Sequence, residues 1–304
     1  MAARHHNMLH FLVPFILLLL FGNSTRLYAG AWTLPRGSVW TKLAWYTLNT
    51  DHQYADIAGI FPGIGEFEPG NRVPYANEGK SLSRAFFMDI VYGVTDRWDI
   101  GVTIPFYQQE FIDNVSRSRG QDTERSGFSD IMGQVKFRIM ARPFVLTVLS
   151  EIKFPTGEFV NIDGVVPVGE GQTDIAFAVS AGTSFWPLPG YTNIEAGWRI
   201  RTTNTDANFD PGDEFYTRWE AGYTLWNRLQ GTLKFYGLFG RPSRFGLAIA
   251  QQTRKRQIVY LSPEIGYRLV HNWMAGAGVN IPLKGRSYPA GRQYFLSLSA
   301  NFTL

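Results

Sequence analysis

The sequence of 304 residues predicts a closed, antiparallel transmembrane β-barrel of about twelve strands. Three observations predict this all-β fold. Apolar and polar side chains alternate with a period of two, the connections between the alternating segments are long and short in turn, and tryptophans gather beside the short connections. Cysteine is absent, which excludes thiolate catalysis, cysteine-ligated metals and disulfide bonds.

The N-terminal region has the pattern of a secretory signal peptide. Residues 1–29 contain an apolar run at 11–21 that is shorter than the roughly 20 residues needed to cross a bilayer and is interrupted by Pro14. Cleavage after Ala29 leaves 30–304 as a single outer-membrane barrel domain. The remaining 27 basic and 25 acidic residues nearly balance, so bulk charge gives no reason to expect nucleic-acid binding.

The alternating segments are the predicted strands, each of roughly 10–13 residues, a length that suits tilted strands crossing hydrocarbon. The last one is the clearest. Tyr294, Leu296 and Leu298 share an apolar face, and Ser297 and Ser299 lie on the opposite face. The twelve segments are 38–49, 81–92, 97–111, 128–140, 144–155, 172–185, 192–203, 214–225, 228–240, 257–269, 273–283 and 292–304.

The connections between these segments predict the orientation of the barrel. The long ones are 50–80, 112–127, 156–171, 204–213, 241–256 and 284–291. The short ones are 93–96, 141–143, 186–191, 226–227 and 270–272. Outer-membrane barrels have short periplasmic turns and long external loops, so we expect both termini in the periplasm of a Gram-negative bacterium.

Five of the nine tryptophans give an independent check of the barrel, because the amphipathic indole ring favours the membrane interface. All five lie at a strand end beside a short turn or near the N-terminus, and together they predict a periplasmic girdle. They are Trp40, Trp98, Trp186, Trp226 and Trp273.

The second face of the strands carries many charges of both signs, which must point into the barrel because charged side chains facing lipid are costly. The candidate lumen-lining residues are Asp130, Lys136, Arg138, Glu151, Lys153, Glu195, Arg199, Arg218, Glu220 and Lys234. Two interpretations remain open. The charges either line a hydrated conduit and select solutes, or form an ion-pair lattice that braces and closes the barrel.

Five of these residues form one predicted group. Asp130, Lys136 and Arg138 lie on one predicted strand, and Glu151 and Lys153 lie on the next. A short turn joins the two strands, so we expect opposite charges to meet across the ladder.

Two long loops have unusual compositions. The longest contains the apolar residues Ile57, Ile60, Phe61, Ile64 and Phe67, which indicate either a lid over the lumen or a loop packed on its own side chains. The loop at 241–256 contains five basic residues and no acid. It is either a partner for lipopolysaccharide phosphates or a solvated basic loop.

An enzymatic function finds little support. Outer-membrane hydrolases need a nucleophile and a base such as histidine, but only His52 and His271 lie outside the predicted leader, and the predicted topology puts them at opposite membrane faces. No metal-ligand spacing, phosphate-binding loop or dinucleotide fingerprint is present. We therefore expect no enzyme activity, no cofactor and no metal.

Several short stretches resemble a known family. They are GAWTLPRG at 30–37, YGVTDRWDIGVTIP at 92–105, GFSD at 127–130 and KFPTG at 153–157. They are similar to the meta-pathway phenol-degradation family of outer-membrane proteins, which are described as transporter barrels. The resemblance implies an outer-membrane barrel and suggests uptake of aromatic or other poorly soluble compounds. We therefore expect a channel for passive uptake of small aromatic or hydrophobic solutes, and the charged interior leaves a structural or surface-interaction barrel closed by salt bridges as the alternative. The expected partners are outer-membrane lipid, lipopolysaccharide, the barrel-insertion machinery and a small-molecule solute.

Overall fold

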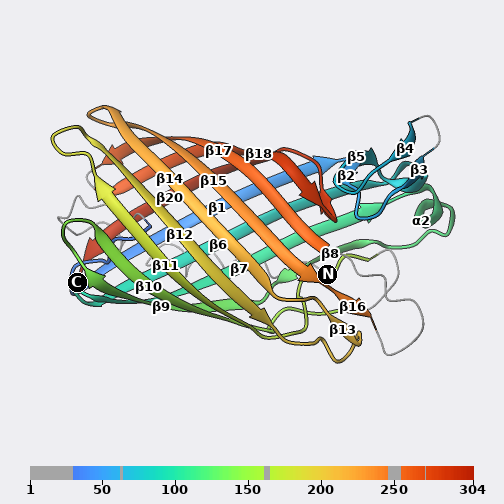
Figure 1. Cartoon of the computed structure of the whole chain (residues 1–304), viewed down its shortest axis with the longest axis horizontal. Coiled ribbons are helices and arrows are strands. Elements are labelled where there is room, and N and C mark those ends of the chain that lie inside the picture. The colour runs from blue at the N-terminus through green and yellow to red at the C-terminus, as the bar shows by residue number, and fades with distance from the viewer. Residues whose placement is uncertain (1–29, 62–63, 161–164, 246–254, 271) are drawn as a thin grey trace, which may run out of the picture.

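A computed structural model describes residues 30–61, 64–160, 165–245, 255–270 and 272–304. The predicted signal peptide at 1–29 lies outside these residues. Twelve long antiparallel strands form one closed barrel (Figure 1), which confirms the predicted fold class. They are β1 (Ser38–Thr50), β6 (Lys80–Thr95), β7 (Trp98–Ile112), β9 (Ile131–Met140), β10 (Val145–Phe154), β11 (Asp174–Ser184), β12 (Gly190–Arg201), β14 (Glu214–Trp226), β15 (Leu229–Pro242), β17 (Lys255–Val270), β18 (Trp273–Arg286) and β20 (Gln293–Thr303).

The barrel closes because β1 pairs with β20 as well as with β6. In this register Val39 faces Phe302 on one side and Tyr92 on the other. A further strand, β8 (Glu124–Phe128), pairs with β7 beyond the point where β9 begins, so β8 and β9 occupy one position in the wall. The closed ladder leaves no open sheet edge between the twelve strands, as a membrane wall requires.

Connection length divides the barrel into two ends (Figure 1). The turns after β6, β9, β11, β14 and β17 gather with the C-terminus at one end, here called the short-turn end. The long connections lie at the opposite, long-loop end and contain the short elements β2 (His52–Tyr54), β3 (Gly59–Phe61), β4 (Gly65–Phe67), β5 (Arg72–Pro74), η1 (Ala76–Glu78), α2 (Asn114–Ser118), β13 (Phe209–Asp210), β16 (Arg244–Phe245) and β19 (Tyr288–Pro289). Among the described residues, no helix is long and apolar enough to cross a membrane.

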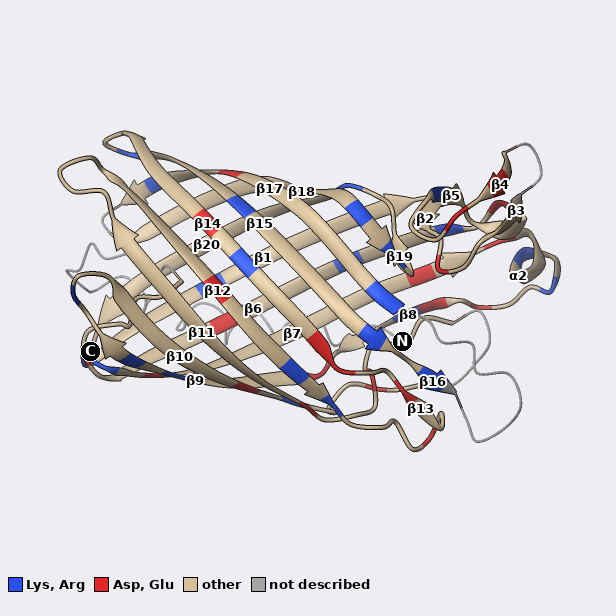
Figure 2. Cartoon of the chain, viewed as in Figure 1, with Lys and Arg blue, Asp and Glu red and all other residues tan. Residues whose placement is uncertain are grey.

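The two faces of the wall differ as the period of two predicts. On β11, Ile175, Phe177 and Val179 are exposed by 37%, 55% and 51%, whereas Ala176 and Ala178 between them are buried. Apolar side chains therefore cover the outside of the barrel, and the polar side chains gather inside. Trp186 and Trp226 are also exposed, next to the short turns. Figure 2 shows that charged positions occur along the middle of the strands as well as in the long loops.

Candidate functional site

The interior of the barrel contains two neighbouring cavities. The outer cavity, toward the long-loop end, has a volume of about 590 Å³, and the inner cavity has a volume of about 610 Å³. Nine residues line both cavities, so the two spaces adjoin within the barrel. We call these nine residues the junction: Phe87, Tyr107, Arg199, Arg256, Ile258, Tyr260, Asn280, Tyr288 and Gln293.

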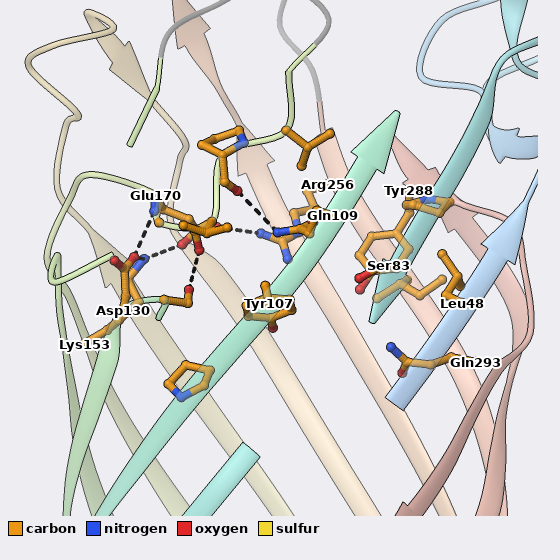
Figure 3. Close-up of a pocket in the computed structure, with 18 of the residues that line it drawn as sticks. Leu48, Ser83, Tyr107, Gln109, Asp130, Lys153, Glu170, Arg256, Tyr288 and Gln293 are labelled. Atoms are coloured by element: carbon orange, nitrogen blue, oxygen red, sulfur yellow. Dashed lines mark hydrogen bonds and ion pairs between the residues drawn. The ribbon is translucent and has the colours of Figure 1, made fainter. Parts of the chain in front are cut away.

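A long connection folds into the outer cavity. This segment, residues 155–160 and 165–173 between β10 and β11, is called the inward loop, and its stretch 166–170 lines the cavity (Figure 3). Two contacts hold it to the wall. Ser129 donates a hydrogen bond to the carbonyl oxygen of Val168, and the Gln109 amide donates one to the carbonyl oxygen of Pro167. The inward loop therefore narrows the lumen at the long-loop end.

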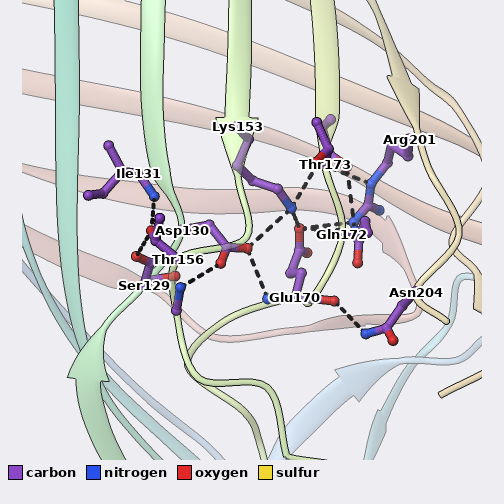
Figure 4. A network of polar contacts seen from close by, with 12 residues as sticks. Ser129, Asp130, Ile131, Lys153, Thr156, Glu170, Gln172, Thr173, Arg201 and Asn204 are labelled. Carbon is purple, nitrogen blue, oxygen red and sulfur yellow. Dashed lines mark hydrogen bonds and ion pairs between the residues drawn. The ribbon is translucent and has the colours of Figure 1, made fainter. Parts of the chain in front are cut away.

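Glu170 fixes the inward loop electrostatically. Its carboxylate contacts the Lys153 ammonium, the Arg201 guanidinium at 3.0 Å and the Arg256 guanidinium at 3.4 Å. Figure 4 shows Glu170 with Lys153, Arg201 and Asn204, and the Asn204 side-chain amide donates a 2.8 Å hydrogen bond to the Glu170 carbonyl oxygen. Burial would raise the pKa of the Glu170 carboxyl, but the surrounding positive charges outweigh burial and hold this pKa well below its ordinary value.

Asp130 fixes the backbone of the same loop at its two ends. Its carboxylate accepts hydrogen bonds from the backbone nitrogens of Gly157 at 3.0 Å and Glu170 at 2.9 Å, and it lies 3.4 Å from the Lys153 ammonium. The two sides of the loop meet at Gly157 and Gly169. A Cβ atom on Gly169 would lie 2.4 Å from the Gly157 carbonyl oxygen, so only glycine fits there.

The charge network extends across several strands through Glu214, which is almost fully buried. Its carboxylate lies 3.1 Å from Arg199, 3.1 Å from Arg201 and 3.8 Å from Arg256. Arg199 also lies 3.5 Å from Glu151. Strands β10, β12, β14 and β17 are therefore linked through the interior by ion pairs as well as by the wall ladder.

The inner cavity combines ion pairs with tyrosine rings. Arg218 pairs with Glu195 at 3.0 Å, and its guanidinium lies over the rings of Tyr216 and Tyr236 at 5.0 and 5.8 Å. The Tyr216 ring lies across Gly197, where a Cβ atom would lie 2.4 Å from the ring. Arg218 is still 45% exposed, so its charge faces the open interior.

A second ion-pair group lies in the same cavity. The Lys234 ammonium contacts Glu264 at 2.7 Å and Glu220 at 3.8 Å. The Tyr191 hydroxyl donates a 2.5 Å hydrogen bond to Glu220. These charges are paired, yet Lys234 is still 33% exposed, so water and ions can reach it.

The N-terminal segment, residues 30–37, enters the barrel at the short-turn end. Ala31 and Leu34 are fully buried, and the Asp99 carboxylate accepts hydrogen bonds from the Leu34 backbone nitrogen at 3.1 and 3.2 Å. The Lys136 ammonium donates a 2.7 Å hydrogen bond to the Gly30 carbonyl oxygen. Gly30 is also one of the residues that line the inner cavity. The segment thus occupies part of the interior at this end.

Nine of the ten lumen candidates line a cavity. Asp130, Glu151 and Lys153 line the outer cavity, and Arg199 lines both. The inner cavity is lined by Lys136, Glu195, Arg218, Glu220 and Lys234. The exception is Arg138, which shares its strand face with Lys136 but lies beyond both cavities, nearer the short-turn end.

Of the charges expected to meet between β9 and β10, Asp130 and Lys153 do so, with 3.4 Å between the carboxylate and the ammonium. In the observed register Lys136 faces Leu149, and Glu151 faces Gln134. Between these two strands, neither Lys136 nor Glu151 has a charged residue directly opposite. Lys136 therefore contacts the N-terminal segment, and Glu151 contacts Arg199 instead.

The structure also differs from the prediction at the basic loop 241–256. Residues 246–254 lie outside the described residues, but β17 begins at Lys255 rather than at 257. The added strand residues bring Arg256 onto the inner face with Ile258 and Tyr260, so this arginine lines both cavities. Arg256 and Glu170 are far apart in the sequence, so no local pattern could predict their contact.

The apolar loop after β1 lies at the long-loop end. Ile57, Ile60 and Ile64 are exposed by 64%, 76% and 50%, and the Phe67 ring lies against Gly59 within the β3–β4 hairpin. In this conformation the three isoleucines are exposed, none of the described residues of this group lines either cavity, and the inward loop is the segment that reaches the lumen.

The described residues contain no cluster of acidic residues or histidines that could hold a metal. His52 lies in β2 at the long-loop end, where its Nδ1 atom is 2.5 Å from the Asp51 carboxylate. His271 lies outside the described residues. His52 thus has an acid neighbour, but lies outside the lining of both cavities.

Comparison with solved structures identifies the fold. The COG4313 outer-membrane channel of Pseudomonas putida F1 matches with a TM-score of 0.73 and 13% identity, over 91% of this chain and 100% of that chain. The translocator domain of the autotransporter NalP from Neisseria meningitidis has a TM-score of 0.46 and 7% identity, over 97% and 95% of the two chains. The Ralstonia pickettii toluene transporter TbuX has a TM-score of 0.43 and 9% identity, over 88% and 90%.

The sequence itself identifies the family. No curated protein matches it significantly. A family model described as "Putative MetA-pathway of phenol degradation" matches residues 64–298, which is most of the chain and confirms the resemblance seen in the short motifs. The chain therefore belongs to the Phenol_MetA_deg family, with the twelve-stranded barrel fold of an outer-membrane channel.

Proposed function

We propose that this protein is an outer-membrane channel through which small solutes diffuse passively. The observation that carries the proposal is the pair of adjoining cavities inside a closed barrel, with partly exposed charges on their walls. The apolar outer wall suits a membrane. The description of the similar Pseudomonas putida barrel as a channel supports the same function. The family description favours aromatic compounds as solutes.

The proposal includes the orientation and processing of the chain. Residues 1–29 are the signal peptide, and cleavage leaves Gly30 as the first residue, within the short-turn end. That end faces the periplasm, and the long loops face outward toward lipopolysaccharide. The exposed Trp186 and Trp226 beside the short turns support a membrane interface at that end, because their rings favour the interface.

A second candidate is a structural or surface-interaction barrel with a closed lumen. Two observations favour it: the N-terminal segment is bonded inside one end, and ion pairs through Glu170 and Glu214 cross the other. The two candidates differ in a measurable property, because only a channel passes ions and small solutes between the two sides of a membrane.

Single-channel recording of the purified protein in planar bilayers tests the proposal. Ser83 lines the outer cavity, and its neighbour Arg84 lies on the opposite face of β6. Ser83→Trp should lower the conductance by filling the lumen, whereas Arg84→Trp should leave it unchanged. Absence of conductance in the wild-type protein and both variants would support the closed barrel instead.

A further inference from the structure

The chemical character of the junction differs from the rest of the lumen. Elsewhere acids and bases alternate along the walls, but the only charged members of the junction are Arg199 and Arg256. Four others are aromatic: Phe87, Tyr107, Tyr260 and Tyr288. A solute that passes from one cavity to the other must meet positive charge and aromatic rings together.

The two arginines differ in their availability to a solute. Arg199 is 20% exposed and lies close to the carboxylates of Glu214 and Glu151. Arg256 is 42% exposed, and its contacts with Glu170 at 3.4 Å and Glu214 at 3.8 Å both use Nη1. A guanidinium has five N–H donors in a planar fork. Arg256 therefore retains donors that a carboxylate in the lumen can reach.

One aromatic ring contacts this guanidinium, and three others line the same junction. The Arg256 guanidinium carbon lies 5.8 Å from the Tyr288 ring centre. The Tyr260 and Tyr236 rings are tilted by 31° with 4.9 Å between their centres, and Tyr107 contacts Phe87 edge-on at 5.7 Å. Figure 3 shows Tyr107, Arg256 and Tyr288 around the same space. A planar ring placed there gains offset or edge-to-face contacts that an aliphatic solute lacks.

We infer that the junction binds aromatic monocarboxylates, with the carboxylate on Arg256 and the ring against Tyr288 and Tyr260. This inference rests on the proposed channel function and names its solute class. Organic cations are disfavoured by the two arginines, and neutral aromatics lack the charge-assisted hydrogen bonds. Benzoate is the simplest probe of the class.

Two measurements with benzoate test the inference. The first is the concentration at which benzoate halves the single-channel current, compared with cyclohexanecarboxylate, which has the same charge but no aromatic ring, and with neutral benzyl alcohol. The second is equilibrium dialysis of labelled benzoate against the folded barrel in detergent. Binding in detergent is measured whether or not the protein conducts, so the two proposals can fail separately.

Substitutions in the junction distinguish the contribution of the arginine charge to benzoate binding from that of the ring contacts. Arg256→Gln should raise the half-blocking and dissociation concentrations by about ten-fold, and Tyr288→Leu by about five-fold. Arg84→Gln and Tyr294→Leu make the same changes on the outer wall and should have no effect. Arg256→Lys keeps the charge without the fork and should be intermediate. Heat-modifiable migration on gels confirms that each variant is folded.

Each outcome decides the inference. The inference is supported if benzoate blocks and binds more tightly than both comparison compounds and if Arg256→Gln removes this difference. Equal effects of benzoate and cyclohexanecarboxylate would reduce the junction to a simple anion site and overturn it. A conducting barrel that does not bind benzoate also overturns it but leaves the channel function intact. Arg256-dependent binding to a barrel that does not conduct refutes the channel and retains the binding site.

Discussion

The Lys136 ammonium and the Gly30 carbonyl oxygen are joined by a 2.7 Å hydrogen bond between residues 106 positions apart in the sequence. This contact ties the N-terminal segment to the inner wall of β9. The same ammonium lies 3.5 Å from the Trp32 carbonyl oxygen, so one side chain holds two points of the segment. The segment remains inside the barrel only while such contacts persist.

Replacing Lys136 should therefore open the short-turn end. Loss of a hydrogen bond to a charged group costs about 1.5–3 kcal/mol, so Lys136→Met should lower the ratio of bound to released segment about ten-fold or more. Single-channel conductance should rise. Arg138→Met, two residues further along the same strand face, is the control. Equal conductance in the wild type and Lys136→Met would show that the segment does not limit flow.

Glu170→Gln should loosen the inward loop. Three cations lose a shared partner, but solvent reaches the 43% exposed Glu170 side chain, so we expect a cost of about 1–2 kcal/mol. Limited proteolysis should cleave within 155–173 faster than in the wild type, and conductance should rise. Glu158→Gln removes an exposed acid from the same loop and should change neither property. Matching proteolysis rates in all three proteins would contradict the electrostatic attachment.

The pH dependence follows from the same contacts. The Glu170 carboxyl has a pKa below its ordinary value of 4.5, so its ion pairs contribute fully above that pH and are lost only as the pH falls through the lowered pKa. Loop protection against protease should be constant from about pH 7 to about pH 5 and decline only under strongly acidic conditions. An acid-stable protease can measure this profile. A loss of protection near pH 6 would implicate a different group.

The proposed orientation can be tested by cysteine labelling, since the native chain contains no cysteine. Ile60→Cys, in an exposed long loop, should react with a membrane-impermeant maleimide on intact cells. Leu188→Cys, in an exposed short turn, should react only after the outer membrane is permeabilised. The reverse labelling pattern would place the short turns on the cell surface.

The cost of a charge on the membrane-facing wall should depend on its depth in the bilayer. Val179→Arg, on the outer face of β11, should lower the free energy of unfolding in lipid vesicles by about 2–4 kcal/mol, because arginine is costly near the bilayer centre. Leu188→Arg, in the adjoining short turn, should cost about 1 kcal/mol or less. Denaturant titration of vesicle-inserted protein measures both values. Similar losses for the two variants would argue against a membrane around β11.

The local sequence pattern was sufficient to predict the strands, but not the contacts that side chains make inside the barrel. Ile175, Phe177 and Val179 could be assigned to the outer wall because alternation along a strand depends only on neighbouring residues. The position of Lys136 opposite Leu149 depends on the strand register, which alternation does not encode. Glu170 lies in a loop without periodicity, so its contacts with distant cations could not be predicted.

Arg256 shows the same limit at a strand boundary. It lies next to Lys255 and follows Arg254 in the sequence, and a basic run of this kind is typical of an exposed loop. Only the partner strands show that the ladder continues, since Lys255 pairs with Pro242 and Gln257 with Phe239. The residue that matters most to the junction was therefore assigned to the wrong environment.

Glu214 has a mechanical consequence for the barrel. Its carboxylate is shared by arginines from β12 and β17, and Arg256 continues the connection through Glu170 to Lys153 on β10. These links cross the interior, whereas the ladder runs only around the circumference. A hollow cylinder bound solely at its circumference flattens under lateral pressure from the surrounding lipid. The crossing ion pairs resist that flattening, so the cross-section at the long-loop end stays rounder than the wall alone would keep it.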